Sequence, residues 1–384
     1  MKLLVTGGAG FIGSNFIRYW LAKYPGDSII NLDKLSYAGN PYTDEKTGIQ
    51  KPANLVDLEG DSRLEFHKFD ITCPILYSKA KFEDEYGRFD REAFQMLKQW
   101  IASADMVVHF AAESHVDRSV LNAGPERPDA YDFILSNTWG THIMLEAAVK
   151  AWRKQDGSYN QGKRFHLIST DEVFGALTLD DPNKFNEQTR YNPRSPYSAS
   201  KAAADHLASS YGVSFGLPVT ISNTSNNYGP YMFPEKLLPL AITELLEGKK
   251  VPIYGDGKYV RDWLYVDDHC RAIDMILHNG TVGETYCIGG MEDDVNNLEL
   301  IRRVLKIMKL GEDRIYYVKD RPGHDRRYAV DWTKAKRELG YQPEYSLDVY
   351  LEKMIEWYQQ HEAWWRPIKS GAFKEYFRRQ YEER

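Results

Sequence analysis

Two adjacent carboxylates in the sequence could act as an acid and a base. The segment "STDEVFG" (169–175) follows the apolar run "RFHLI" and places Thr170, Asp171 and Glu172 where a strand should end. Carboxylates at such a point are often only the solvated start of a loop. In a continuing strand, Asp171 and Glu172 would point to opposite faces. Both can therefore serve one site only if the strand ends near Thr170.

A glycine-rich turn near residue 10 predicts a dinucleotide site. Gly7, Gly10 and Gly13 lie in "TGGAGFIG", between a predicted strand and a predicted helix. Glycines there let the backbone approach a pyrophosphate, and the helix N-terminus supplies donors. Asp33 ends the next predicted strand, and its carboxylate suits the ribose hydroxyls of NAD but repels the 2′-phosphate of NADP. We therefore expect NAD as the cofactor.

Tyr197 and Lys201 form a second pair with chemical potential. They lie four residues apart in "YSASK", a segment with helical spacing, so both side chains fall on one helix face. A tyrosine is a poor base at neutral pH because its reference pKa is about 10, but a neighbouring ammonium and an oxidised nicotinamide both favour the phenolate. With Thr170 as a further hydroxyl, the pair predicts removal of a hydroxyl proton while a hydride leaves.

The elements that must position these residues alternate between strands and helices. The predicted strands are "KLLVTG", "SIINLD", "LEFHKFD", "MVVHFAA", "RFHLIST" and "PVTISNT". Segments with helical spacing, such as "THIMLEAAVKAW" and "SKAAADHLASSYG", separate most of them. This alternation predicts an α/β fold with a doubly wound, Rossmann-type parallel sheet.

The pattern loosens after about residue 225, which predicts two domains. At 384 residues, the chain exceeds the size at which one core usually stops growing. We expect an NAD-binding domain over 1–225, to which about 262–290 returns. The remainder, 226–384, is expected to form a smaller C-terminal α/β lobe that binds substrate, followed by a tail. The polar, turn-rich segments 39–54 and 122–130 are predicted to be surface loops.

Composition and charge exclude several functions. The formal net charge of -6 gives no basic surface for nucleic acid or an anionic membrane. The start "MKLLVTGG" leads directly into a strand and no apolar run could span a bilayer, so we expect a cytoplasmic protein. Three scattered cysteines predict buried thiols in a reducing compartment. His109 and His115 lack the spacing of metal ligands, so no metal is expected. The aromatic and basic segment 362–384 is predicted to be a partly ordered helical tail.

Seven segments together resemble the extended short-chain dehydrogenase/reductase superfamily, and within it the dTDP-glucose 4,6-dehydratase family. They are "TGGAGFIG", "AAESHVDRS", "STDEVFG", "SPYSASK", "NNYGPYMFPEKLLP", "RDWLYVDDH" and "DRPGHDRRYA", and the resemblance runs to about residue 360. Sugar-nucleotide epimerases share several of these motifs, whereas the Asp-Glu pair and "RPGHDRRY" are particular to the dehydratases. The chain departs from the family at Phe174, where Tyr is usual, and at Met232, where His is common.

The resemblance implies a reaction and a role for each catalytic residue. NAD would oxidise the C4 hydroxyl of dTDP-glucose, assisted by Thr170, Tyr197 and Lys201. Glu172 would then remove the C5 proton, while a protonated Asp171 would donate to the departing C6 hydroxyl. The hydride would return to C6, which regenerates NAD. The resemblance also implies a homodimer.

Ligand contacts are implied in the same way. The residues expected to contact NAD are Gly7, Gly10, Phe11, Ile12, Gly13, Asp33, Lys34, Leu35, Ser36, Asp70, Ile71, Phe110, Ala111, Ala112, Ser114, Ser136, Tyr197, Lys201 and Asn227. Those expected to contact the nucleotide sugar are Ser114, Thr170, Asn226, Lys236, Leu237, Pro252, Tyr254, Arg261, Asn297, Arg321 and His324. Arg261 and Arg321 suit a diphosphate because a guanidinium can donate two hydrogen bonds to phosphate oxygens.

Three hypotheses stay open on the sequence. The first is the dehydratase. The second is another nucleotide-sugar enzyme, either a 4-epimerase or a dehydratase for a CDP or UDP sugar. The third is a non-catalytic NAD-binding protein. An epimerase needs Tyr197 and Lys201 but has no use for the pair of Asp171 and Glu172, which therefore favours the first hypothesis.

Overall fold

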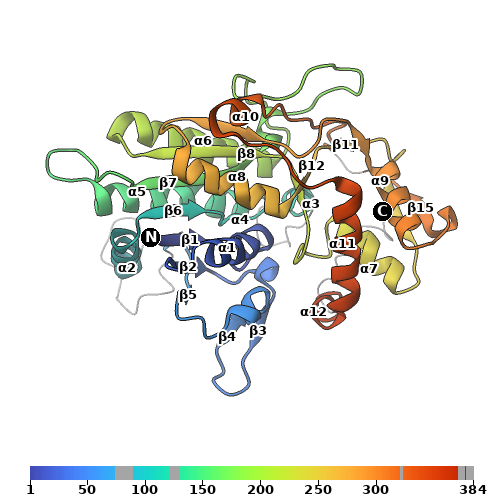
Figure 1. Ribbon diagram of the computed structural model, residues 1–384, viewed down its shortest axis with the longest axis horizontal. Helices are drawn as coiled ribbons and strands as arrows, with labels where there is room; N and C mark the ends of the chain where they lie inside the picture. Colours follow the sequence, from blue (N-terminus) through green and yellow to red (C-terminus); the bar gives the residue numbers. More distant parts are fainter. Residues whose placement is uncertain (74–89, 122–129, 321–322, 371–376, 378–384) are drawn as a thin grey trace.

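A seven-stranded parallel sheet forms the centre of the protein. The computed structural model describes residues 1–73, 90–121, 130–320, 323–370 and 377 (Figure 1). The sheet has the strand order β13-β8-β7-β6-β1-β2-β5. Its strands are β1 (Lys2–Thr6), β2 (Ser28–Asp33), β5 (Leu64–Lys68), β6 (Met106–His109), β7 (Arg164–Thr170), β8 (Val219–Thr224) and β13 (Thr285–Ile288). This arrangement confirms the predicted doubly wound, Rossmann-type class.

Helices cover both faces of the sheet. On one face, α2 (Arg91–Ser103), α5 (Gly140–Trp152) and α6 (Pro196–Phe215) share an apolar core with the strands. On the other face, α1 (Phe11–Lys23) and α8 (Val266–Asn279) form a second core. A sheet buried on both sides needs nearly continuous apolar strands, which explains runs such as "KLLVT". The helices leave the carboxyl ends of the strands available for a site.

Smaller elements of the C-terminal half pack beyond the end of the sheet (Figure 1). They include three strand pairs: β9 (Asn226–Tyr228) with β12 (Trp263–Tyr265), β10 (Val251–Tyr254) with β15 (Ile315–Val318), and β11 (Val260–Arg261) with β14 (Val295–Asn296). The helices there are α7 (Leu237–Leu246), α9 (Asn297–Ile307), α11 (Leu347–Gln360) and α12 (Glu362–Ile368), whereas α10 (Thr333–Leu339) packs against β13 and α8. A separate apolar core joins α7, α9, α11 and α12. The domain limits stay a prediction.

The structure tests the prediction of a loop for segment 39–54 but not for most of segment 122–130. Residues 39–54 contain an antiparallel hairpin of β3 (Pro41–Thr43) and β4 (Gln50–Pro52), so the prediction of a simple loop is wrong. Its strands are short and polar and lack the alternation that signals a strand, while an ion pair of 2.7 Å between Lys51 and Asp44 supports the hairpin. In the second segment, residues 122–129 lie outside the described residues.

Short helical turns are the remaining helical elements of the described residues. They are α3 (Val116–Leu121), α4 (Tyr131–Phe133), a π-helical turn (Ile134–Trp139) and the 3-10 turns Tyr37–Gly39, Ala53–Leu58, Asp171–Phe174 and Glu312–Arg314. The predicted helical tail is helical over Glu362–Ile368. The turn Asp171–Phe174 matters most for function, because it interrupts the chain where the two carboxylates stand.

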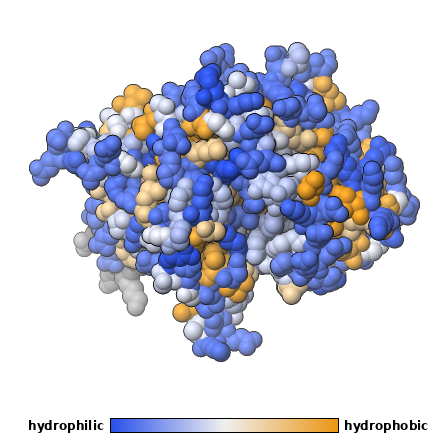
Figure 2. Space-filling view, viewed as in Figure 1, coloured by the Kyte–Doolittle hydropathy of each residue, from blue (hydrophilic) through white to orange (hydrophobic). Residues whose placement is uncertain are grey.

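The surface is mainly polar and the thiols are buried. Hydrophilic residues cover most of the face shown in Figure 2, and hydrophobic residues form small separate groups on it. Cys73, Cys270 and Cys287 are free and buried, as predicted. Within the described part of the chain, no helix is long and apolar enough to cross a membrane.

The buried histidine of β7 makes stability depend on pH. The two ring nitrogens of His166 lie 3.0 Å and 3.2 Å from the hydroxyls of Thr220 and Ser222. Burial lowers the pKa of His166 to about 3. Its usual value is near 6.5, so the unfolded chain binds more protons between about pH 6.5 and pH 3. His166 therefore lowers the free energy of unfolding as the pH falls through this window.

We expect His166→Gln to have a free energy of unfolding that depends less on pH than that of the wild type. The difference in slope should reach about 1.4 kcal/mol per pH unit, because one titrating group is removed. Urea unfolding of both proteins between pH 7 and pH 5 gives the two slopes, and the buried carboxylates common to both proteins cancel. Equal slopes would show that His166 does not titrate on unfolding.

Candidate active site

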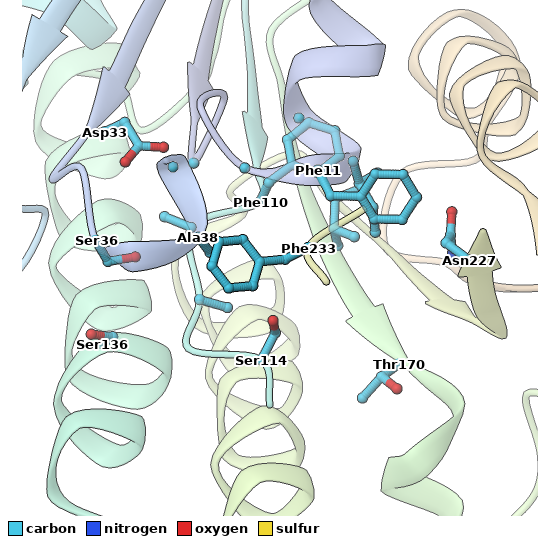
Figure 3. Close-up of a pocket in the computed structure, with 18 of the residues that line it drawn as sticks. Phe11, Asp33, Ser36, Ala38, Phe110, Ser114, Ser136, Thr170, Asn227 and Phe233 are labelled. Atoms are coloured by element: carbon cyan, nitrogen blue, oxygen red, sulfur yellow. The ribbon is translucent and has the colours of Figure 1, made fainter. Parts of the chain in front are cut away.

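A cavity of about 280 Å³ lies at the carboxyl ends of the parallel strands. Figure 3 shows Asp33 and Ser36 toward one end of it and Thr170 and Asn227 toward the other. Of the residues predicted to act on or bind ligands, those that line it are Gly7, Gly10, Phe11, Ile12, Gly13, Asp33, Lys34, Ser36, Asp70, Ile71, Phe110, Ala111, Ala112, Ser114, Ser136, Thr170, Glu172, Tyr197, Lys201, Asn226, Asn227 and Lys236.

The glycine turn after β1 has a shape that suits a dinucleotide. Gly7 has φ +72°, and a Cβ atom on it would lie 2.6 Å from the backbone nitrogen of Ala111. A Cβ atom on Gly13 would lie 2.4 Å from the carbonyl oxygen of Gly7. Gly10, Phe11 and Gly13 also line the cavity at the start of α1, where free N–H groups favour a pyrophosphate. The cradle therefore fits NAD.

The carboxylate of Asp33 is held by backbone donors at the end of β2. It accepts hydrogen bonds from the N–H groups of Ala9 (2.9 Å) and Leu35 (2.8 Å). Burial raises the pKa of Asp33, and these two donors act in the opposite direction. Leu35 is buried and does not line the cavity, so its contribution to the site is this backbone bond.

Two lysines on the cavity wall are held by neighbouring elements. The Lys34 ammonium lies 2.6 Å from a Glu113 carboxylate oxygen and donates to the Ser136 hydroxyl at 3.0 Å. Lys236 donates to the carbonyl oxygen of Ser114 at 3.2 Å. These bonds join the end of β2 to the segment after β6, and that segment to the start of α7.

The strand that carries the two carboxylates ends at Thr170, as predicted. β7 stops there, and a 3-10 turn begins at Asp171. The Thr170 hydroxyl caps the turn by accepting a hydrogen bond of 3.3 Å from the N–H of Glu172. Asp171 and Glu172 therefore lie outside the strand, where successive side chains would have to point to opposite faces. Glu172 lines the cavity, whereas Asp171 is buried and is not among the lining residues.

Asp171 has the surroundings of a protonated acid. Its side chain is buried, with the residue 1% exposed, and one carboxyl oxygen has no hydrogen-bond partner among the described residues. Burial raises the pKa of Asp171 well above its usual range, and the nearby Glu172 and Asp262 add to the shift. Repulsion between adjacent carboxylates favours a proton on the more deeply buried one.

Helix α6 places Tyr197 and Lys201 one turn apart, both buried. The helix begins at Pro196, and the hydroxyl of Ser195 caps it by accepting from the N–H of Ser198 at 3.0 Å. Lys201 donates to the carbonyl oxygen of Ile168 at 2.7 Å. The helix is thereby fixed to β7, two residues before Thr170.

The ionisation of Tyr197 differs from the expectation that Lys201 favours a phenolate. Burial raises the pKa of Tyr197, and the carboxylate of Glu172 acts in the same direction, whereas a hydrogen bond with Thr170 lowers it. Burial lowers the pKa of Lys201 to about 8. The protein groups therefore keep Tyr197 as a phenol. A positive nicotinamide would shift its pKa downward.

A buried carboxylate behind the site was not predicted from the sequence. Asp205 lies one turn after Lys201 and accepts hydrogen bonds from the side chains of Ser169 (2.8 Å), Tyr191 (2.9 Å) and Asn223 (3.1 Å). It fixes the ends of β7 and β8, and its charge partly opposes the fall in the pKa of Lys201. The four-residue spacing after Lys201 was the only signal available in the sequence.

Some residues predicted to bind the nucleotide sugar lie outside this cavity. They are Leu237, Pro252, Tyr254, Arg261, Asn297 and His324. Three of them lie near Tyr259. His324 stacks on the Tyr259 ring at 3.6 Å, Tyr254 meets the ring of His324 edge-on at 5.9 Å, and the N–H of Asn297 donates to the carbonyl of Tyr259 at 2.9 Å. The rings of Tyr254, Tyr259 and His324 form an aromatic group at the start of β11.

Of the two arginines expected to bind the diphosphate, the structure describes Arg261 but not Arg321. Arg261 is buried; its guanidinium lies 4.3 Å from the centroid of the Tyr328 ring and donates to the carbonyl of Val260 at 2.7 Å. Arg321 lies outside the described residues.

The structure adds cavity residues that the sequence did not single out, among them Tyr37, Ala38, Phe233 and Glu235. Tyr37 donates to Glu235 at 2.9 Å, and its ring meets that of Phe233 edge-on at 5.2 Å. The sequence indicated these residues only by their position: Tyr37 and Ala38 closely follow Asp33, and Phe233 and Glu235 closely precede Lys236. No group of three metal-ligating side chains occurs among the described residues.

Comparisons with known proteins agree with this geometry. The family model for GDP-mannose 4,6 dehydratase matches residues 82–354. A dTDP-glucose 4,6-dehydratase of Shigella flexneri is 41% identical, with all of both chains covered. The structure of a dTDP-glucose 4,6-dehydratase from Streptomyces venezuelae with bound NAD is 40% identical over 96% of this chain and 100% of the other, with a TM-score of 0.80.

The same fold also occurs in epimerases, at lower identity. A UDP-glucuronic acid 4-epimerase from Bacillus cereus is 28% identical over 94% of this chain and 99% of the other, with a TM-score of 0.75. The matches to dehydratases are stronger in both identity and coverage. The chain belongs to the dTDP-glucose 4,6-dehydratase family.

Proposed function

We propose that the protein converts dTDP-glucose to dTDP-4-keto-6-deoxyglucose, with NAD as its bound cofactor. Membership of the family and the NAD-bound relatives support this reaction. The observation that carries the proposal is the pair of Asp171 and Glu172 after β7, one carboxyl deeply buried and the other on the cavity wall. An elimination that needs one group to donate a proton and another to accept one has a use for this asymmetry.

The first half of the reaction is oxidation at C4 of the sugar. NAD, when bound along the glycine turn, accepts the C4 hydride and later returns it to C6. Tyr197, which the positive charge of the bound nicotinamide shifts toward the phenolate, takes the proton of the C4 hydroxyl, with Thr170 as a second hydroxyl partner. Lys201 is an ammonium below about pH 8 and contributes positive charge on the same helix face. The product of this half is a 4-keto sugar.

The second half is loss of water across C5 and C6. The C4 ketone acidifies the C5 proton, which Glu172 removes. Asp171 gives its proton to the C6 hydroxyl, so that the C6–O bond breaks and water leaves. The resulting C5=C6 double bond takes up hydride at C6 and a proton at C5. The sum is one water lost, with no net oxidation of the sugar.

We propose that the ligands divide the binding residues between them. The cavity residues from the glycine turn to Asn227 would hold NAD. The nucleotide sugar would lie between Thr170 and the aromatic group around Tyr259, whose flat rings suit stacking on a base. Arg261 and Arg321 would bind the diphosphate, because guanidinium groups pair well with phosphate oxygens.

Incubation of the purified protein with dTDP-glucose tests the proposed function. The expected product is a 4-keto-6-deoxy sugar nucleotide, detected by its absorbance in alkali and by loss of one water in mass spectrometry. UDP-glucose and CDP-glucose run in parallel as competing substrates. A product in which the configuration at C4 is inverted would favour a 4-epimerase. Preference for a CDP or UDP sugar would replace thymine as the nucleobase of the proposed substrate. Absence of turnover with every nucleotide hexose would favour a non-catalytic NAD-binding protein.

Asp33 should make the protein prefer NAD over NADP. Its carboxylate stands at the end of β2, where it would meet the extra phosphate of NADP with like charge. We expect the wild type to bind NAD at least about tenfold more tightly, a difference of about 1.4 kcal/mol, and Asp33→Asn to narrow this ratio. Titration of both proteins with each nucleotide measures it. Equal affinities of the wild type for NAD and NADP would show that Asp33 does not select against the 2′-phosphate.

We further propose a cytoplasmic homodimer in which residues 1–225 with about 262–290 form the NAD-binding domain and the rest of 226–384 the substrate lobe. Exposed apolar side chains support self-association: Tyr131, Ile134 and Trp139 follow one another along consecutive turns before α5 and are 42–50% exposed. Light scattering of the purified protein should give twice the chain mass; the mass of a single chain would contradict the dimer.

A further inference from the structure

Asn54 joins the two segments that flank one end of the NAD cavity. Its side chain is buried, and its amide nitrogen donates to the carbonyl of Ala9 at 2.7 Å and to that of Ala38 at 3.4 Å. Ala9 lies within the glycine turn and its N–H binds Asp33, while Ala38 lines the cavity. The Asn54 side chain thus holds the glycine turn against the segment that follows Asp33.

The orientation of this amide is set by the C-terminal helix. The indole N–H of Trp364, in α12, donates to the Asn54 side-chain oxygen at 2.8 Å across 310 positions of sequence. An indole N–H can only donate, and the two carbonyl groups can only accept. Trp364 therefore requires the amide oxygen on its own side, which directs the amide nitrogen toward Ala9 and Ala38.

Helix α12 is itself fixed in the C-terminal half. Trp365 is fully buried, and Lys369 pairs with Glu244 at 2.6 Å and Glu247 at 2.9 Å at the end of α7. In α11, the hydroxyl of Tyr358 donates to the carbonyl of Met232, which lines the cavity. The C-terminal helices thus reach the cavity at two points, through Asn54, which binds the cavity residue Ala38, and through Met232.

We propose that Trp364 is a positioning residue for NAD, which orients Asn54 so that the glycine turn and the Ala38 segment stay closed on the cofactor. This inference rests on the proposed function, because a reaction that returns its hydride to the same sugar needs a cofactor that stays bound between the two hydride transfers. The C-terminal helix then sets how slowly NAD leaves. The proposal gives a function to a segment that carries no catalytic group.

Two tryptophans allow a matched test of the proposal. The ring of Trp357 lies 5.2 Å from that of Trp364, and both contact Tyr231, but only the indole N–H of Trp364 donates to Asn54. We expect Trp364→Phe to release NAD roughly threefold to tenfold faster, as expected for loss of one hydrogen bond. Trp357→Phe should stay within about twofold of the wild type. The measurement is the dissociation rate of radiolabelled NAD from the full-length protein after dilution into excess unlabelled NAD.

Further readouts separate positioning from loss of structure. At saturating NAD, kcat and the KM for dTDP-glucose should change much less in Trp364→Phe than the NAD dissociation rate. Asn54→Ala should release NAD at least as fast, and adding Trp364→Phe to it should bring no further increase. If Trp364→Phe does not fold, Asn54→Ala alone carries the test, with the expectation of faster release.

The possible outcomes separate the role of Trp364 from the proposed function. Equal NAD release by the Trp364 and Trp357 variants would overturn the inference, as would an additive effect of the Asn54 and Trp364 substitutions, or unchanged release by Asn54→Ala. If the wild type itself failed to bind NAD, the proposed function would fail instead. Release that is faster only for Trp364→Phe and Asn54→Ala, in correctly folded proteins, supports the role of Trp364.

Discussion

Glu172→Gln is expected to oxidise the sugar at C4 but to stop before the loss of water. The substitution keeps the shape of a side chain on the cavity wall and removes its ability to accept a proton. A positioned base supplies roughly a hundred- to ten-thousand-fold in rate, so release of the 4-keto-6-deoxy product should fall by that factor. Absorbance of the reduced nicotinamide should build up during a single turnover, and mass spectrometry should find a nucleotide of 4-keto glucose that still contains its C6 hydroxyl.

Asp171→Asn provides the matched comparison for Glu172→Gln. Without the acid, removal of the C5 proton can still occur, so deuterium from heavy water should enter C5 of the bound sugar while loss of water stays slow. Glu172→Gln should show no such exchange. Product formation by Glu172→Gln at the wild-type rate would assign the base to another residue. Loss of C4 oxidation in a folded Glu172→Gln protein would mean that Glu172 organises the site instead.

Tyr197→Phe is expected to abolish the reaction at its first step. The ring is buried and packs edge-on at 6.2 Å from Phe133, so the variant retains the packing and loses only the hydroxyl. Without a group to take the C4 hydroxyl proton, C4 oxidation should fall roughly a hundred- to ten-thousand-fold. Neither reduced nicotinamide nor product should form, whereas binding of dTDP-glucose should change little. Single-turnover absorbance and a binding titration measure the two quantities.

Tyr191→Phe is the control for Tyr197→Phe. Tyr191 also carries a partly buried hydroxyl, but this hydroxyl donates to Asp205 and Tyr191 does not line the cavity. Its loss should lower stability and leave C4 oxidation close to that of the wild type. If Tyr197→Phe retained turnover comparable to that of Tyr191→Phe, then Tyr197 would not be the base.

The parts of the site that could be predicted from the sequence depend on local pattern. The glycines, Asp33, Tyr197 and Lys201 lie within single strand-to-helix units whose periodicity and turn residues are visible in the chain. The end of β7 at Thr170 could be expected because two carboxylates follow an apolar run. These predictions needed only the rule that ligands bind at the carboxyl ends of parallel strands.

The remaining features depend on contacts between distant segments. The raised pKa of Tyr197 follows from its burial beside Glu172, and no spacing along the chain reports burial. Asp205 gains its role from strands on either side of it, and Asn54 meets a tryptophan 310 positions away. The hairpin over 41–52 escaped prediction because its short polar strands have no hydrophobic alternation.

Transfer of hydrogen from C4 to C6 within one sugar is the most direct test of the proposed dehydration. With dTDP-glucose that carries deuterium at C4, we expect a product with deuterium in the C6 methyl group, because the hydride taken from C4 returns to C6 of the same sugar. NMR of the product locates the label. Deuterium that remains at C4, or that is lost to solvent before product forms, would contradict the proposed dehydration.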